Sequence, residues 1–276
     1  MHHRGIGSWV LLFIMVLLAL SSSLASCTRG GVSRTITEAG SSTVQPLAEK
    51  LAAAFKQKQP DAKVIIQGGG TSVGIKSVND GTVNIGAASR ELTPDDPPLV
   101  KHLLARDGIA IITRPKNAVV GLTKGQVRDI FGGIVTNWKD VGGPNHEIHV
   151  IVREEGSGTR TAFEDMVMAK PEPAMKIMNT AIQLPSNGAI KTAVASDTNA
   201  IGFISFGYLD TSIKALAIDG VAATEPNAKN GTYPIVRPLY FLTKEQPTGL
   251  VKDFIDFCLS PDGQAIVTQE GYISVI

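Results

Sequence analysis

Three glycine-rich segments carry Ser and Thr at points where a strand is expected to run into a helix. They are "GSSTV" (40–44), "GGGTSVG" (68–74) and "GSGT" (156–159). The first N–H groups of a helix lack intrahelical partners, and the helix dipole favours negative charge there. Glycine allows close backbone approach, and the hydroxyls add donors. One such loop is most often a cap and a turn, but three in one chain predict convergence on one small oxyanion.

Charged residues surround the third loop in "REEGSGTR" (153–160). The Arg153 guanidinium can give two parallel hydrogen bonds to a tetrahedral oxyanion, so we expect it to face the ligand. Glu155 can hold that arginine through an ion pair. We assign Glu154 and Arg160 to the solvated surface, the usual place of charged runs. Arg90, at the end of another expected strand, is the second cation that we expect near the anion.

Enzyme and metal chemistry are less well supported. Gly70–Gly74 fits G-x-S-x-G, which presents a nucleophilic serine between a strand and a helix. A hydrolase of that class needs a base histidine later in the chain, but the last histidine is His149. His146 and His149 have no evident third ligand, so we expect surface histidines and no metal site. No nucleotide P-loop motif occurs, so no cofactor is expected.

The elements that must position these loops alternate along the chain. Apolar, β-branched runs predict strands, and apolar residues at helical spacing predict helices. This order predicts an α/β fold with mainly parallel sheets. The expected strands are 33–40, 63–67, 83–89, 108–114, 148–152, 200–206 and 235–243, and the expected helices are 46–58, 73–80, 123–131, 161–168 and 248–260.

Composition limits the possible partners. The chain has 276 residues, of which 43% are hydrophobic and 18% charged, so it can form a sizeable core. Its net charge is +1, and Arg4 is the one charged residue before Cys27. The rest of the chain is therefore electrically balanced, which argues against nucleic acid as a partner. Any bound anion must be held by local groups.

The N-terminus indicates export. Arg4 precedes the apolar run Trp9–Leu20, which is shorter than a membrane span, and small residues follow it. The segment "LASC" (24–27) resembles a bacterial lipobox, which implies cleavage before Cys27 and lipidation of its sulfur. We expect a signal peptide at 1–26, a lipidated tether at 27–33, and a membrane-anchored protein on the periplasmic or extracellular face. Cys258, the other cysteine, is expected to be a buried small hydrophobe.

Five segments carry a family resemblance. They are "AGSSTVQPLAEKLAAAF", "GGGTSVGIKSVNDGTVNIGAASREL", "LTKGQVRDIFGGIVTNWKDVGG", "REEGSGTRTAFE" and "NAIGFISFGYL". In order and spacing they resemble the phosphate-binding proteins of bacterial phosphate ABC transporters, over about 34–276. The resemblance implies a two-lobed periplasmic-binding-protein fold of type II, with a ligand cleft and two crossing strands as hinge. Lobe 1 would be 34–113 plus 238–276, and lobe 2 would be 114–237.

The resemblance also implies a set of phosphate contacts. Glu155 would support Arg153. Well-known enteric members have Asp at the position of Arg90, where it accepts the proton of hydrogen phosphate, so the proton acceptor here is unidentified. The implied contacts are Ser42, Thr43, Val44, Thr71, Ser72, Ser89, Arg90, Arg153, Ser157, Gly158, Thr159 and Asn187.

The expected function is capture of inorganic phosphate and its delivery to an ABC permease in the membrane, by a monomer that is not an enzyme. Two alternatives stay open. One is a binding protein for another oxyanion, such as sulfate, molybdate or tungstate. The other is a phosphate-sensing or adhesion lipoprotein.

Overall fold

A computed structural model of the chain describes residues 34–169 and 172–276. The expected signal peptide, the tether and the lipidation site Cys27 lie outside the described residues. Within those two ranges, no helix is long and apolar enough to cross a bilayer.

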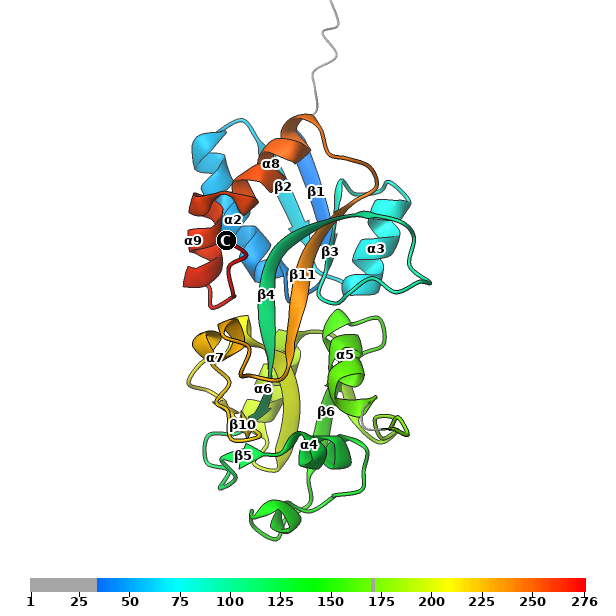
Figure 1. Ribbon diagram of the computed structural model, residues 1–276, viewed down its shortest axis with the longest axis vertical. Coiled ribbons are helices and arrows are strands. Elements are labelled where there is room, and N and C mark those ends of the chain that lie inside the picture. Colours follow the sequence, from blue (N-terminus) through cyan, green and yellow to red (C-terminus); the bar gives the residue numbers. More distant parts are fainter. Residues whose placement is uncertain (1–33, 170–171) are drawn as a thin grey trace, which may run out of the picture. The chain divides into compact units, whose positions relative to one another are not determined.

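The first lobe is a small parallel sheet covered by helices (Figure 1). Strand β1 lies at its centre, paired with β2 on one side and β3 on the other. Its elements are β1 (Thr35–Gly40), α2 (Gln45–Lys58), β2 (Lys63–Gln67), α3 (Thr71–Asn79), β3 (Ile85–Ala88), α8 (Gly249–Leu259) and α9 (Pro261–Gln269). Helix α2 has a proline in its first turn and buries Leu47, Leu51 and Phe55 at helical spacing, which is why it forms here.

The second lobe repeats this arrangement with other strands. Strand β6 pairs in parallel with β7 and β8, and helices α5 and α6 begin after β6 and β7. Thr123 and Gln126 form a capping box that starts α4. The elements are β5 (Gly121–Leu122), α4 (Lys124–Phe131), η1 (Trp138–Val141), β6 (His149–Arg153), α5 (Gly158–Phe163), the π-helical turn η2 (Glu164–Met168), β7 (Ile182–Leu184), α6 (Asn187–Ser196), β8 (Ala200–Ser205), η3 (Phe206–Tyr208), β9 (Lys214–Ala215), β10 (Ala217–Ile218) and α7 (Glu225–Lys229).

Two strands join the lobes, β4 (Val100–Thr113) and β11 (Val236–Thr243) (Figure 1). They pair antiparallel with each other, and β11 also pairs antiparallel with β3. The second half of β4 pairs antiparallel with β8, so β4 belongs to both lobes. The prediction of mainly parallel sheets therefore holds within each lobe and is wrong where the chain crosses between them. Two expected elements differ from the structure: β4 begins at Val100 and not at 108, and the helix expected at 161–168 begins at Gly158, is α-helical only to Phe163 and continues as the π-helical turn η2.

Each lobe has its own hydrophobic core. One core takes its residues from 36–105 and 239–272, where Phe55 packs edge-on against Phe254. The other takes them from 109–235 with Ile273, and there Phe163 stacks on Phe203 at 4.2 Å between ring centres. Cys258 is buried in the first core, as predicted, and burial raises the pKa of its thiol. Two cores joined by two strands allow the lobes to move relative to each other.

Glu38 is an exception to the apolar interior of the first lobe. Its side chain lies on β1 and is 1% exposed, and neither carboxylate oxygen has a hydrogen-bond partner within the described residues. Burial raises the pKa of this carboxyl well above its usual range, and the nearby charge of Glu49 adds to the rise. The folded protein therefore keeps Glu38 neutral at pH values at which the unfolded chain has already ionised it.

This burial predicts a falling stability with rising pH. The folded pKa is raised, so the free energy of unfolding is highest below the unfolded glutamate pKa of about 4.3 and falls as pH rises towards the folded pKa. Glu38→Gln should remove this decline, because an amide does not titrate. Glu49→Gln, on the exposed side of α2, should keep most of it. Urea unfolding at a series of pH values checks this, and parallel profiles for wild type and Glu38→Gln would contradict it.

Candidate anion-binding site

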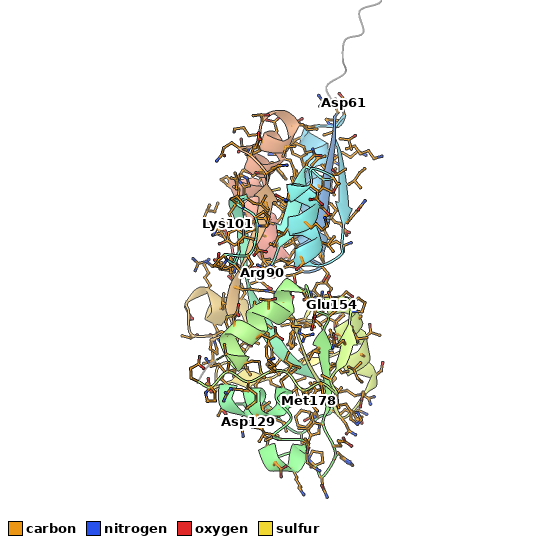
Figure 2. All side chains as sticks on the ribbon, turned by 90° about the vertical axis from the view of Figure 1, so that its right-hand side faces the viewer. Asp61, Arg90, Lys101, Asp129, Glu154 and Met178 are labelled. Atoms are coloured by element: carbon orange, nitrogen blue, oxygen red, sulfur yellow. The ribbon has the colours of Figure 1, made fainter. Side chains whose placement is uncertain are left out.

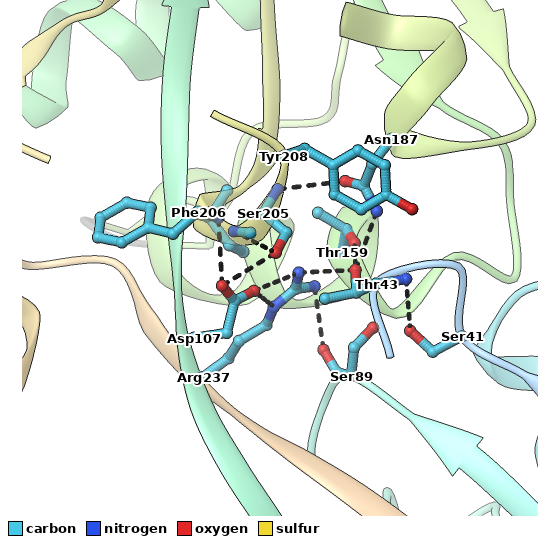
Figure 3. A network of polar contacts seen from close by, with 12 residues as sticks. Ser41, Thr43, Ser89, Asp107, Thr159, Asn187, Ser205, Phe206, Tyr208 and Arg237 are labelled. Carbon is cyan, nitrogen blue, oxygen red and sulfur yellow. Dashed lines mark hydrogen bonds and ion pairs between the residues drawn. The ribbon is translucent and has the colours of Figure 1, made fainter. Parts of the chain in front are cut away.

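Thr43 belongs to the first lobe and forms side-chain contacts with the second. Its Oγ1 lies 3.1 Å from Oγ1 of Thr159, and Asn187 Nδ2 donates to it at 3.0 Å (Figure 3). Thr43 follows β1 in the first lobe, whereas Thr159 and Asn187 begin helices α5 and α6 of the second. All three side chains are buried. Two of the three glycine-rich loops, with α6, thus converge on one hydroxyl.

The loop before α3 joins the same region through Thr71. The Ser89 amide donates to Thr71 Oγ1 at 3.1 Å, and the two side-chain hydroxyls are 3.4 Å apart. Gly158, at the start of α5, lies directly against them. A Cβ on Gly158 would lie 2.3 Å from Thr71 Oγ1 and 2.6 Å from Ser89 Oγ. Glycine is therefore required where the second lobe presses on this loop.

The start of α5 presents donors to this region. Ser157 caps the helix by accepting a hydrogen bond from the Arg160 amide at 3.3 Å. The amides of Gly158 and Thr159 make no hydrogen bond within the described part of the chain. We use the name cross-lobe cluster for the buried polar residues gathered in this region, whose further contacts are described below: Ser42, Thr43, Thr71, Ser89, Asp107, Ser157, Thr159, Asn187, Ser205 and Arg237.

Arg153 is buried beside this cluster, with 1% of its side chain exposed. Its Nε and Nη2 donate to the two carboxylate oxygens of Glu154, both at 2.9 Å, and Nη2 also reaches the Pro185 carbonyl. In the described chain Nη1 makes no hydrogen bond, so it can serve a ligand. The charge of Arg153 acts on Arg237, where it adds to the lowering of the pKa that burial causes.

The roles predicted for the neighbouring charges need correction. Glu155 was expected to support Arg153, but its side chain is exposed and Glu154 makes the ion pair. Arg160 was assigned to the solvated surface, yet it donates to Glu164, to the Arg153 carbonyl and to Gln183. Alternation along an extended strand would place Glu155 on the side of Arg153, but β6 ends at Arg153 and the chain turns at Glu155 and Gly156, so Glu154 makes the pair instead.

The Glu154 ion pair predicts a difference in stability between two neighbouring variants. Glu154→Ala should lower the free energy of unfolding by about 1–3 kcal/mol, because it leaves the buried Arg153 guanidinium without its acceptor. Glu155→Ala should change it by less than about 0.5 kcal/mol, as expected for an exposed side chain. Urea unfolding of both variants without ligand checks this. Equal effects, or a larger effect for Glu155→Ala, would contradict the assignment.

Three other predicted contacts are not brought to the cluster. Arg90 forms an ion pair with Asp96 and donates to the Glu91 carbonyl, within the loop that follows β3. Figure 2 labels both Arg90 and Glu154 at mid-height of the molecule, but no hydrogen bond of the Arg90 side chain goes to the second lobe within the described residues. The Val44 amide donates to the Ser41 carbonyl at 3.0 Å, and its side chain belongs to the first core. Ser72 is exposed, and its amide donates to the Gly156 carbonyl of the other lobe.

Sequence reasoning missed two central residues, Asp107 and Arg237. They lie opposite each other on β4 and β11, and Arg237 Nε and Nη2 donate to Asp107 Oδ2 at 3.2 and 2.9 Å (Figure 3). Burial raises the pKa of Asp107, while the charge of Arg237 acts in the opposite direction. The signal that could have indicated them was a charged residue beside or within an apolar strand run, Asp107 directly before the expected strand 108–114 and Arg237 within 235–243.

Two tyrosines donate hydrogen bonds to backbone carbonyls of the loop between β1 and α2. Tyr208, on η3 of the second lobe, donates to the Ser42 carbonyl at 2.7 Å. Tyr272 donates to the Thr43 carbonyl at 2.9 Å. Burial raises the pKa of Tyr208 to about 12, so its hydroxyl stays protonated and can donate. The loop between β1 and α2 is therefore fixed by both lobes.

The serine-hydrolase alternative has no support in this geometry. Ser72 is exposed, and the side chains of His102 and His149 form hydrogen bonds with residues other than Ser72. His102 Nε2 bonds Thr243 Oγ1, and His149 Nδ1 lies 2.6 Å from Asp197. Across 34–169 and 172–276, no group of three or more His, Cys, Asp or Glu residues could hold a metal ion.

Two lobes, each with its own core, joined by two strands and facing each other across buried hydrogen-bond donors, define a solute-binding protein of the periplasmic-binding-protein class. Residues 25–262 match the family model of the PBP superfamily domain. The chain is 36% identical to the phosphate-binding protein PstS of Bacillus subtilis over 88% of its own length and 81% of that protein.

Two solved structures are also similar. One is a putative phosphate ABC transporter substrate-binding protein with bound phosphate from Clostridium perfringens, at 42% identity and a TM-score of 0.84, over 88% of this chain and 100% of that one. The other is an ABC-type phosphate transport receptor from Vibrio cholerae, at 35% identity and a TM-score of 0.72, over 86% and 99%. The chain therefore belongs to the PstS family of phosphate-binding proteins.

Proposed function

We propose that this protein binds inorganic phosphate between its lobes and delivers it to an ABC-type permease, without catalysing a reaction. The observation that carries the proposal is the cross-lobe cluster, in which hydroxyls of both lobes and the first amides of α5 gather beside Arg153. Relatives that share the fold bind phosphate, and one was solved with phosphate bound.

The proposed mechanism is capture by substitution of water. Thr43, Thr71, Ser157 and Thr159 donate hydroxyl hydrogen bonds, the Gly158 amide adds a backbone donor, and Arg153 Nη1 adds a charged one. Together they replace the water shell of the anion. Bending of β4 and β11 lets the lobes close on it, and the closed form is presented to the permease.

The charges of the side chains around the donors determine how the anion is held. Arg153 is paired with Glu154, and Arg237 with Asp107, so the charged side chains beside the anion sum to zero. The anion is then held by oriented dipoles and hydrogen bonds, which fix its geometry more strictly than a net positive charge would.

A second candidate ligand is a fully deprotonated oxyanion such as sulfate. The buried carboxylate of the cluster, Asp107, already accepts four hydrogen bonds, from Ser205, the Phe206 amide and twice from Arg237. It has no lone pair left for the proton of hydrogen phosphate. Enteric relatives have a carboxylate at the position of Arg90 that accepts this proton. Here the Arg90 guanidinium is a donor and forms an ion pair with Asp96.

The remaining parts of the proposal concern anchoring and organisation. Lipidation of Cys27, after cleavage of 1–26, would tether a monomer to the outer face of the membrane through 27–33. We assign 34–113 plus 238–276 to lobe 1 and 114–237 to lobe 2. The first core lies within this lobe 1, which supports the division, but the second core already includes Ile109–Ile112 and also Ile273, so it extends beyond 114–237.

Titration calorimetry with phosphate, sulfate, molybdate and arsenate tests the proposal. We expect tight binding of phosphate and arsenate, which share a charge and a proton, and much weaker binding of sulfate and molybdate. The opposite order would favour the second candidate. No binding of any of the four anions would contradict the proposed function.

A further inference from the structure

We propose that Arg237 and Asp107 form a positioning unit on the crossing strands, which makes the Thr43 hydroxyl an obligate hydrogen-bond donor to the anion. This inference rests on the proposed function and assigns a role within it to a pair that no loop motif contains. The pair is carried by the same two strands on which the lobes move.

Thr43 Oγ1 has two lone pairs with which it can accept hydrogen bonds. Arg237 Nη2 donates to this oxygen at 3.0 Å, and Asn187 Nδ2 donates to it at 3.0 Å (Figure 3). Neither nitrogen can accept a hydrogen bond in return. The Asn187 amide cannot be reversed, because its Oδ1 accepts from the Ser205 amide at 3.2 Å. Both lone pairs of the hydroxyl are therefore occupied.

A hydroxyl whose two lone pairs are occupied can only donate. The remaining neighbour of Thr43 Oγ1 is Thr159 Oγ1, 3.1 Å away in the other lobe. The proton of Thr43 therefore points towards Thr159 at the start of α5, where the amides of Gly158 and Thr159 have no hydrogen-bond partner among the described residues. A ligand oxygen placed there must therefore accept a hydrogen bond from Thr43.

Asp107 keeps Arg237 in this orientation. Oδ2 of Asp107 accepts hydrogen bonds from Nε and Nη2 of Arg237. Oδ1 accepts from Ser205 Oγ at 3.0 Å and from the Phe206 amide at 3.2 Å. Arg237 Nη1 donates to the Ser89 carbonyl at 3.1 Å, which leaves Nη2 for Thr43. The carboxylate thus ties β8 and η3 of the second lobe to the arginine that polarises a hydroxyl of the first.

The test compares Arg237→Lys in two backgrounds by titration with phosphate. Lysine keeps the buried positive charge opposite Asp107 but cannot hold Asp107, Ser89 and Thr43 at once. In the wild-type background we expect phosphate to bind about 10-fold more weakly or worse. In Thr43→Val, which has no hydroxyl to orient, adding Arg237→Lys should have little further effect.

Arg90→Lys is the matched control, because Arg90 makes a similar two-oxygen ion pair, with Asp96, away from Thr43. It should leave phosphate affinity unchanged. If Arg237→Lys lowers the melting temperature of the ligand-free protein, the comparison is repeated with the double variant Arg237→Met and Asp107→Leu, which leaves no buried charge unpaired.

An equal loss of affinity in the Thr43→Val background would show that the pair acts by general support of the fold, and would overturn the inference. So would an unchanged affinity of Arg237→Lys in the wild-type background. Either result leaves the proposed function intact, provided that the wild-type protein binds phosphate. Failure of the wild type itself to bind would count against the proposed function instead.

Discussion

Replacing Arg153 by methionine should weaken phosphate binding by about 100-fold or more, because each hydrogen bond to a charged group contributes about 1.5–3 kcal/mol. Methionine fills much of the space of the buried arginine stem but carries no donor. The loss should appear as a higher Kd in titration calorimetry. The unfolding transition without ligand should remain cooperative, because the released Glu154 is partly exposed and can be hydrated.

Arg160→Met is the control for this prediction. Arg160 lies seven residues further along the same loop and helix, but its Nε donates to Glu164 and its Nη1 to Gln183 and the Arg153 carbonyl. It should retain most of the wild-type affinity. An equal loss of phosphate affinity in both variants would show that binding depends on the total positive charge of the loop and not on a contact from Arg153. Wild-type affinity in Arg153→Met would exclude Arg153 from the site.

Gly158→Ala should also abolish tight binding, by keeping the lobes apart. The added Cβ would lie 2.3 Å from Thr71 Oγ1 and 2.6 Å from Ser89 Oγ, closer than non-bonded atoms approach. The second lobe must then withdraw, and the neighbouring contact between Thr43 and Thr159 is lost. We expect phosphate affinity to fall about 100-fold or more, as two or more charge-assisted bonds are removed. Small-angle scattering should show no compaction when phosphate is added.

Gly188→Ala is a matched control at the start of the neighbouring helix. A Cβ there would meet Ser186 Oγ and Tyr208 at 3.8 Å, which is ordinary contact. This variant should bind phosphate and compact like the wild type. Wild-type binding by Gly158→Ala would show that the lobes need not approach as closely as the structure places them.

The sequence was most informative where local chemistry decides the structure. Strand-to-helix junctions end parallel strands at one edge of a sheet, so their loops must converge. In the structure Thr43 meets Thr159, and Thr71 lies against Gly158, which Ser157 directly precedes at the start of α5. Asn187, which starts a further helix, joins them through its amide.

The direction of a side chain was less predictable than the position of its loop. Arg90 lies at the end of its strand as expected, but Asp96, only six residues later, takes its guanidinium. Glu154 and Glu155 are adjacent and chemically alike, and the turn after β6 decides which one meets Arg153, because strand alternation alone would have favoured Glu155.

Contacts between distant strands were beyond local reasoning. Asp107 and Arg237 meet because β4 and β11 pair in one particular register, which depends on the assembly of both lobes. The polar residues Lys101, His102 and Arg106 also concealed the first half of β4. A charged residue beside or within an apolar strand run, as with Asp107 and Arg237, is nevertheless a pattern that can be sought in other sequences.

The central claim is that the cross-lobe cluster holds the anion, and a crystal structure with bound phosphate tests it most directly. We predict phosphate within hydrogen-bond distance of Thr43 Oγ1, Thr159 Oγ1 and Arg153 Nη1, with the Arg237–Asp107 pair intact behind Thr43. Phosphate bound beside Arg90, or at any place that leaves Thr43 and Arg153 without contact to it, would contradict the account.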